Sequence, residues 1–313
     1  MPVYQRAKLK VVFLESAACN RIRIKSRGIS ISAVLKYLKE TIKLILASIY
    51  AIYLYLSPGK TMRIILCYHN VNNQDTKHFR KQMELLVNKK YRIVKVSEIM
   101  TAASNDAHVV VGITFDDALV SAIENALPVL EELSLPATIF VPTGNLGRPP
   151  QWPFDNSFYN ESESVITEKQ IAELDKNGFE IFSHTVSHPF LTKVGNDKLR
   201  RELVESKQAL EKIVGHEVIG LSYPHGDYNA EVCKTARAAG YRLGFSIEPC
   251  TVNRSPSDLA IGRFLLSAND SLLKFKLNIM GAYQITNYLC AIKGLILGIL
   301  RPKTLLIRRD RLP

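Results

Sequence analysis

Residues 109–117 have the sequence VVVGITFDD, an apolar run that ends in two adjacent carboxylates, Asp116 and Asp117. Uninterrupted apolar runs rich in β-branched residues are typical of strands buried in a parallel sheet. Adjacent aspartates by themselves most often cap a helix or lie in a solvated turn. A carboxylate pair directly after a buried strand instead indicates a functional site, because barrel enzymes carry their chemistry at the C-terminal strand ends.

A second strand-like run, residues 179–183, leads into HTVSH, which places His184 and His188 four positions apart. Such a histidine pair alone is more often a pair of surface or core histidines than a metal site. One carboxylate and two imidazoles, however, form a common ligand set for catalytic zinc and leave a position open for water. The other carboxylate is then available as a base, and the combination predicts metal-assisted hydrolysis.

Two further strand-like runs also end in polar or turn residues. Residues 63–67 lead into Tyr68 and His69, and residues 218–222 lead into YPHG, residues 223–226. Helical patterns separate the runs, and we expect helices at 79–89, 118–133, 167–177, 197–214 and 229–239, with further strands at 91–94, 136–141 and 241–245. Strands that alternate with helices of this length predict a parallel α/β sheet.

These motifs resemble those of the polysaccharide deacetylases, the NodB-like or carbohydrate esterase family 4 proteins. TFDD at 114–117 is similar to the first family motif, HTVSH at 184–188 to the second, and SYPHG at 222–226 to a variant of the third. The resemblance covers residues 62–270, about two thirds of the chain. It implies an irregular (β/α) barrel of about seven strands.

The resemblance implies a specific chemistry. Asp117, His184 and His188 would hold a divalent metal, with zinc the first choice and other transition metals not excluded. Asp116 would be the general base, and the backbone N–H of His225 would donate to the tetrahedral oxyanion. The products would be acetate and an amino sugar that is positively charged at neutral pH.

The chain departs from the usual family pattern in two places. Ser222 stands where the third motif usually has arginine, and no late L-x-H motif is present. The chain instead resembles a permuted, exopolysaccharide-processing branch, in which an early Tyr-His dipeptide supplies the catalytic acid; the resemblance implies that His69 would be this acid. The alternative is a strand-end histidine bonded to backbone. Arg263 would replace the missing arginine and orient Asp116, unless it forms only a structural salt bridge.

Substrate contacts are expected from Tyr68, Tyr223, Pro224 and Trp152. Trp152 is the single tryptophan and follows a polar, proline-rich loop, so it either contacts a sugar ring or packs its loop onto the barrel. The reaction we predict is N-deacetylation of a polysaccharide or glycan. Two alternatives remain: hydrolysis of another C–N amide bond on the same barrel, or a degenerate barrel that binds glycan without cleaving it.

Charge is distributed unevenly along the 313 residues, whose net charge is +12. Residues 1–63 carry a net +10 and residues 271–313 a net +7, which leaves −5 for residues 64–270. A basic patch outside the folded domain disfavours nucleic acid as a ligand. Five scattered cysteines disfavour a disulfide framework. We divide the chain into a basic N-terminal segment, 1–61, a catalytic domain, 62–270, and a basic amphipathic tail, 271–313.

The basic flanks are interleaved with apolar residues, which favours an anionic membrane surface as a partner. The uncharged run Leu44–Leu56 is shorter than the roughly 20 residues that a full span needs. It would form an in-plane membrane helix, a tilted span or signal anchor, or a helix packed on the barrel. For residues 272–300 an interfacial helix is favoured over a packing helix. We expect membrane association in a bacterial-type envelope, on either the cytoplasmic or the outer face.

Overall fold

The computed structural model describes residues 31–56, 61–102, 109–152 and 163–287. The chain divides into two compact units, residues 1–42 and 43–313. In the first unit the described residues form the start of helix α1, Ile31–Leu56, which continues into the second unit. All of the motifs named above lie in the second unit.

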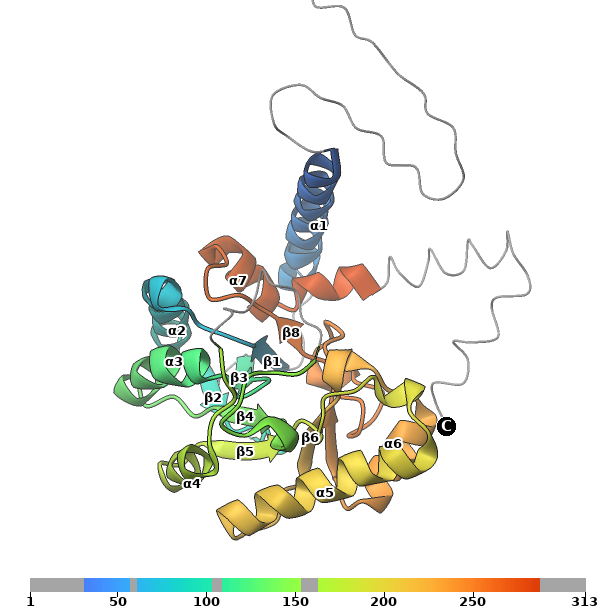
Figure 1. The fold of residues 1–313 in the computed structure, drawn as a ribbon. Coiled ribbons are helices and arrows are strands. Elements are labelled where there is room, and N and C mark those ends of the chain that lie inside the picture. Colours follow the sequence, from blue (N-terminus) through green and yellow to red (C-terminus); the bar gives the residue numbers. More distant parts are fainter. Residues whose placement is uncertain (1–30, 57–60, 103–108, 153–162, 288–313) are drawn as a thin grey trace, which may run out of the picture. The chain divides into compact units, whose positions relative to one another are not determined.

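The second unit is built on a parallel sheet with helices around it (Figure 1). The described strands are β1 Met62–Tyr68, β2 Arg92–Val94, β3 Val109–Phe115, β4 Thr138–Val141, β5 Glu180–Ser183, β6 Gly220–Ser222, β7 Leu243–Phe245 and β8 Phe264–Leu265. They pair in parallel in the order β7-β6-β5-β4-β3-β1-β8, and β2 pairs separately with β3. The predicted irregular barrel of about seven strands is confirmed.

The two ends of this sheet are linked by the segment just before β8. Ile261 forms an isolated parallel bridge with Phe245 of β7, while Phe264 and Leu265 of β8 pair with β1. Residues 261–265 therefore run from the last strand of the series to the first. A side chain on this segment that points inward therefore lies inside the barrel that the curved sheet forms.

Five helices agree with the predicted ones to within a few residues: α2 Thr76–Asn88, α3 Val120–Glu132, α4 Glu168–Lys176, α5 Asn196–Val214 and α6 Ala230–Ala238. A further helix, α7, spans Leu272–Ile279. α4 begins with a capping box, in which the side chains of Thr167 and Gln170 each accept a hydrogen bond from the other residue's backbone N–H. Strand β3 is buried along its whole length, which explains why its sequence is apolar without alternation.

Helix α7 extends the packing of the catalytic domain beyond residue 270, the boundary expected from the sequence. Phe275 and Ile279 of α7 belong to the main hydrophobic core. The continuous amphipathic helix expected over residues 272–300 is not found in its described part, because α7 ends at Ile279 and Gly281 adopts a left-handed conformation. Residues 288–300 lie outside the described residues.

Helix α1 is buried on one face. Ala47 and Ala51 pack in a small cluster with Leu277 and Ala282, while Ile45, Ile49, Ile52 and Tyr53 are exposed. The second compact unit therefore begins at residue 43, whereas from the sequence we expected the catalytic domain to start at residue 62. In the described part of the chain, no helix has both the length and the apolar character needed to cross a membrane.

Candidate metal and catalytic site

Parallel pairing brings the predicted site residues to one edge of the sheet. The backbone N–H of Asp116 donates to the Tyr68 carbonyl at the end of β1, and the N–H of His184 donates to the Val141 carbonyl at the end of β4. The C-terminal ends of β1, β3, β4 and β5 therefore meet at the same edge. Residues far apart in the sequence converge there because the strands run in the same direction.

The three predicted metal ligands converge on a small volume. His184 Nε2 lies 3.4 Å and His188 Nε2 lies 3.3 Å from the same oxygen, Asp117 Oδ1. Ligands about 2.1 Å from a tetrahedral zinc lie about 3.4 Å from one another, so these spacings fit the ion. Asp117, His184 and His188 are all buried. The donor set and its spacing thus fit a divalent metal.

The protonation of the two histidines also suits a metal. His184 Nδ1 lies 2.9 Å from the Ser222 carbonyl oxygen; with the proton on Nδ1 as donor, Nε2 faces Asp117 with a lone pair. Burial, aided by the His184 charge, lowers the pKa of His188 to about 3 and keeps it neutral. Burial opposes charge on His184 too, but Asp117 and Asp116 outweigh it and raise its pKa. A bound cation would replace the proton that His184 takes up as a result of this raised pKa.

Asp116 is held by Arg263 through two short hydrogen bonds. Arg263 Nη1 donates to Asp116 Oδ1 at 2.6 Å, and Nη2 donates to Asp116 Oδ2 at 2.7 Å. The other N–H groups of Arg263 donate to the Thr114 hydroxyl, the Ser222 hydroxyl and the Ser246 carbonyl. Arg263 is completely buried. A buried guanidinium with all of its donors used holds a carboxylate in one orientation.

The barrel topology explains how Arg263 reaches this position. Arg263 lies between Ile261, which bridges β7, and Phe264, which pairs with β1. It therefore enters the interior from the segment that links the two ends of the sheet. Ser222, at the end of β6, stands where the third family motif usually has arginine. Its hydroxyl donates to Asp116 Oδ2 at 3.1 Å.

The electrostatic balance keeps Asp116 ionised. Burial by itself raises the pKa of this carboxyl, but the charge of Arg263, with smaller contributions from His184, outweighs burial and holds the pKa below its ordinary value. Asp116 Oδ2 lies 4.0 Å from His184 Nε2. A permanently charged carboxylate is thus placed beside the candidate metal ligands without itself being one of the three.

Glu202 of α5 fixes the loop that carries the two histidines. Its carboxylate accepts hydrogen bonds from the backbone N–H groups of Val186 and Ser187 and from the Ser187 hydroxyl. Sequence reasoning missed this residue. The available signal was a glutamate beside Leu199 and Leu203 on the apolar face of an amphipathic helix, where a charged residue needs a partner.

Several site residues have strained backbones. Asp117, Thr185, His188 and His225 have φ values of 67°, 68°, 56° and 59°, in the left-handed region that residues other than glycine rarely adopt. Strain of this kind costs of order 1–3 kcal/mol per residue and is concentrated at functional sites. The hydrogen bonds of Glu202 stabilise one of these loops.

Aromatic rings continue outward from the metal ligands. The Trp152 ring stacks on His188 with centroids 4.6 Å apart, the His225 ring lies edge-on to His188, and Phe190 stacks on His225 with centroids 4.0 Å apart. Phe190, which sequence reasoning missed, is 39% exposed. Trp152 is only 5% exposed, which fits the alternative in which it packs its loop down.

Two of the predicted substrate contacts, Tyr68 and Tyr223, lie in the core of the protein. Tyr68 and Tyr223 are fully buried, and their hydroxyls donate to Gln82 Oε1 and to the Leu259 carbonyl. Both tyrosines are the inward members of their strand ends, so they pack in the core and do not reach solvent. Pro224 is also buried and shapes the turn before His225.

The remaining predicted residue, His69, lies at the site. It follows β1 directly and is partly exposed. His69 is among the groups that, against the effect of burial, hold the pKa values of Asp116 and Asp117 below the ordinary value. Its role as the acid stays a prediction.

Comparison with known proteins shows what this chain is similar to. The family model for polysaccharide deacetylase matches residues 103–244. A putative polysaccharide deacetylase, YxkH, of Bacillus subtilis (strain 168) is 28% identical over 211 residues, 65% of this chain and 71% of that protein. The poly-β-1,6-N-acetyl-D-glucosamine N-deacetylase of Staphylococcus aureus (strain MRSA252) is 31% identical over 166 residues, 50% of this chain. The chain spans about half of that relative, 54% of its length.

Solved structures show the same fold. IcaB from Ammonifex degensii has a TM-score of 0.59 at 23% identity, covering 72% of this chain and 97% of that one. The deacetylase PplD of Streptococcus pyogenes, in complex with acetate, has a TM-score of 0.57 at 24% identity, covering 71% and 99%. The predicted resemblance and the predicted class of enzyme are confirmed: residues 103–244 match the polysaccharide deacetylase family model, and the relatives of this chain include named deacetylases.

Proposed function

We propose that this chain is a metal-dependent hydrolase that removes N-acetyl groups from the amino sugars of a polysaccharide. The observation that carries the proposal is the convergence of Asp117 Oδ1, His184 Nε2 and His188 Nε2 at spacings of 3.3–3.4 Å beside a fourth, separately held group, Asp116. A relative named for deacetylation of poly-β-1,6-N-acetyl-D-glucosamine supports a polymer of N-acetylhexosamine as substrate.

The three ligands suit zinc, since one carboxylate oxygen and two imidazole nitrogens form a usual catalytic set. When bound, the metal supplies Lewis-acid chemistry, polarising an amide carbonyl and lowering the pKa of water. Asp116 accepts the proton of the attacking water, and Arg263 fixes the direction in which its carboxylate points.

His225 and His69 act on the substrate at later points of the reaction. The His225 N–H, on a backbone turned by its positive φ after Pro224, donates to the developing oxyanion. His69 donates a proton to the amine as the C–N bond breaks, leaving acetate and an amino sugar.

The contacts of Arg263 support an active enzyme over a barrel that only binds glycan. A barrel that binds glycan without cleaving it would be consistent with Ser222, which stands where the family motif has arginine. Arg263 makes bidentate contact with Asp116, so the base has the orienting partner that Ser222 alone would not provide. A binding protein has no need of an oriented base beside three metal ligands.

The test is to measure bound metal and acetate release together. We expect His184→Ala and His188→Ala to lose both, because each removes a ligand. His78 is an exposed histidine on α2, outside the site, and His78→Ala is the matched control that should keep both. Full metal content in both site variants would refute the ligand assignment. Metal binding without acetate release from any N-acetylated glycan would refute the reaction.

We also propose that the protein binds an anionic membrane surface. The exposed residues Ile45, Ile49, Ile52 and Tyr53 form an apolar stripe on α1, and Lys39 and Lys43 precede it on the same helix. Apolar burial and the charge of the basic flanks would act together, because each basic residue near an anionic surface contributes about 1 kcal/mol.

A further inference from the structure

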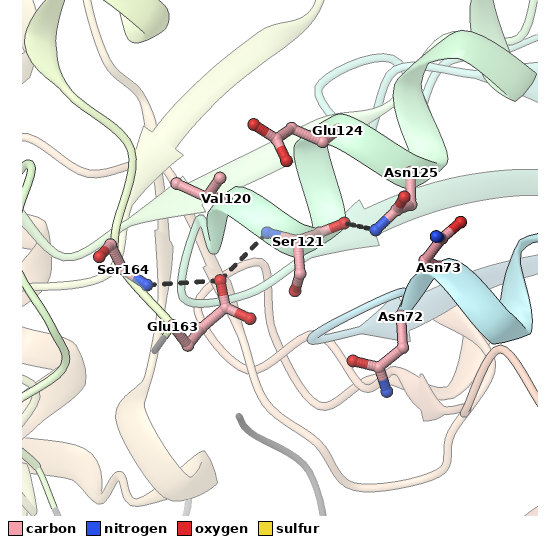
Figure 2. A pocket seen from close by; sticks show the side chains of 8 residues that line it. All are labelled: Asn72, Asn73, Val120, Ser121, Glu124, Asn125, Glu163 and Ser164. Carbon is pink, nitrogen blue, oxygen red and sulfur yellow. Dashed lines mark hydrogen bonds between the residues drawn. The ribbon is translucent and has the colours of Figure 1, made fainter. Parts of the chain in front are cut away.

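A polar pocket lies where the loop after β1 meets the start of α3 (Figure 2). It has a volume of about 300 Å³ and is lined by Asn72, Asn73, Val120, Ser121, Glu124, Asn125, Glu163 and Ser164. All of these except Val120 carry an amide, hydroxyl or carboxylate group. This size is at the lower end of the roughly 300–1,000 Å³ found for small-molecule sites, and it suits a single sugar unit.

The pocket is close to the catalytic cluster. Asn72 follows His69 by three residues, and Val120 follows Asp117 by three. Since consecutive Cα atoms are 3.8 Å apart, the pocket wall begins within about 11 Å of the catalytic histidine and the metal ligand. A polymer with one unit at the metal would bring a neighbouring unit to this pocket.

Glu163 is the most informative residue of the lining. It is only 6% exposed, and its Oε1 accepts hydrogen bonds from the backbone N–H groups of Ser121 and Ser164. Among the residues that the structure describes, Oε2 has no hydrogen-bond partner, and Figure 2 shows it directed toward the side where Asn72 and Asn73 lie. Among the described residues, the buried polar atoms without a partner do not include Oε2, so this oxygen is open to the pocket that Glu163 lines. A carboxylate oxygen that faces a pocket and receives no hydrogen bond there favours a ligand that brings a positive charge or an N–H.

The rest of the lining favours the same kind of ligand. Glu124, exposed on α3, is a second carboxylate, and none of the eight described lining residues is basic. Asparagine and serine side chains bond hydroxyl groups. A ligand with one ammonium group and several hydroxyls matches this set, and the amino sugar left by N-deacetylation has both.

We propose that this pocket binds an amino-sugar unit of the polymer that has already lost its acetyl group, next to the unit that reacts. This rests on the proposed function for the identity of the polymer. The ammonium group faces Glu163 and Glu124, whereas an acetamide at the same place would bring bulk and no charge. The enzyme then acts preferentially beside existing free amines, so deacetylated units cluster along the polymer.

The test is calorimetric titration of the metal-loaded full chain with two probes, a glucosamine tetramer and the matching N-acetylglucosamine tetramer. Glu163→Gln keeps an oxygen that accepts from Ser121 and removes the charge. Glu124→Gln removes the exposed charge and has no part in capping α3. Glu131→Gln, also exposed on α3 but seven residues further along, is the matched control.

We expect the wild type to bind the glucosamine tetramer more tightly than the acetylated one. Glu124→Gln should weaken the glucosamine complex by about two- to fivefold, as for an exposed ion pair. Glu163→Gln should weaken it by about tenfold or more, as for a buried charge-assisted hydrogen bond. Glu131→Gln should change nothing, and the preference should decrease as salt rises from 50 to 500 mM.

The proposal is overturned if the wild type shows no preference, or if both pocket variants keep it. Should Glu163→Gln unfold, the exposed Glu124→Gln alone decides. Failure of the proposed function gives a different pattern, since binding is measured without turnover. If the protein releases acetate but shows no charge-dependent preference for the glucosamine tetramer, only the proposed role of the pocket is refuted. A preference that the pocket variants abolish, in a protein that releases no acetate, refutes only the reaction.

Discussion

Replacing Arg263 with Met tests the buried ion pair on which the orientation of Asp116 depends. The substitution keeps a side chain of similar length and leaves Asp116, only 2% exposed, without its partner. Breaking a buried ion pair by removing one partner costs about 3–5 kcal/mol, because the other charge remains uncompensated. The same variant should keep the three metal ligands but lose acetate release, since Asp116 is no longer held in one orientation.

The loss of stability should depend on pH. In the wild type Arg263 holds the pKa of Asp116 below its ordinary value, so the ion pair stabilises the fold above about pH 4 and is lost only as pH falls through the lowered pKa. Without Arg263, burial dominates and the pKa of Asp116 rises above its wild-type value. The variant then takes up a proton at higher pH, which removes the unpaired charge. The stability difference should therefore narrow as pH falls.

The assay is urea unfolding of both proteins from pH 4 to pH 8, with chelator present so that metal does not contribute to stability. Arg242→Met is the matched control, because Arg242 forms an exposed ion pair with Glu217 that is worth at most about 1 kcal/mol. The double variant Asp116→Leu with Arg263→Met should be more stable than Arg263→Met alone at pH 7. An Arg263→Met protein as stable as Arg242→Met, or a stability difference that does not change with pH, would contradict the reasoning.

Three further predictions concern the base, the acid and the membrane. Asp116→Asn should retain metal and lose about 10²–10⁴-fold in kcat, whereas Asp117→Asn should lose metal as well; equal metal contents by atomic absorption would refute this division. His69→Ala should keep metal and lower kcat far more than it changes KM in steady-state kinetics, because protonation of the leaving amine belongs to the transition state; an unchanged kcat would make His69 a structural residue. Ile49→Asp should weaken sedimentation with anionic vesicles while Val87→Asp, at an exposed position on α2, should not; equal sedimentation would count against the apolar stripe.

The parallel sheet could be predicted because its strands are encoded locally. The run at 109–115 is apolar at every position, and the strand it forms is buried along its whole length. The start of α4 was predictable from Thr167 and Gln170, because a capping box involves only four consecutive residues. Asp117, His184 and His188 could be placed together because parallel strands end at one edge.

Contacts that depend on side-chain direction could not be predicted. Tyr68 and His69 are neighbours at the end of β1, yet Tyr68 packs on Phe115 in the core while His69 is partly exposed near Asp116. Successive side chains of a strand point to opposite faces, and a one-residue difference in register exchanges them. The sequence contains both residues but does not state which one faces the site.

The sequence by itself determined the order of strands β1 to β7 and of helices α2 to α6, the position of the metal-binding motifs at strand ends and the separation of basic flanks from an acidic middle, because each depends on neighbouring residues. Only the tertiary structure decided that Arg263 forms an ion pair with Asp116, 147 residues away. It also decided that Glu202 bonds the loop of the two histidines and that Glu163 bonds the start of α3. These contacts join segments that meet only when the sheet curves and its ends are linked. Which distant residues come into contact depends on how the two ends of the sheet are joined, and a local sequence pattern does not contain that information.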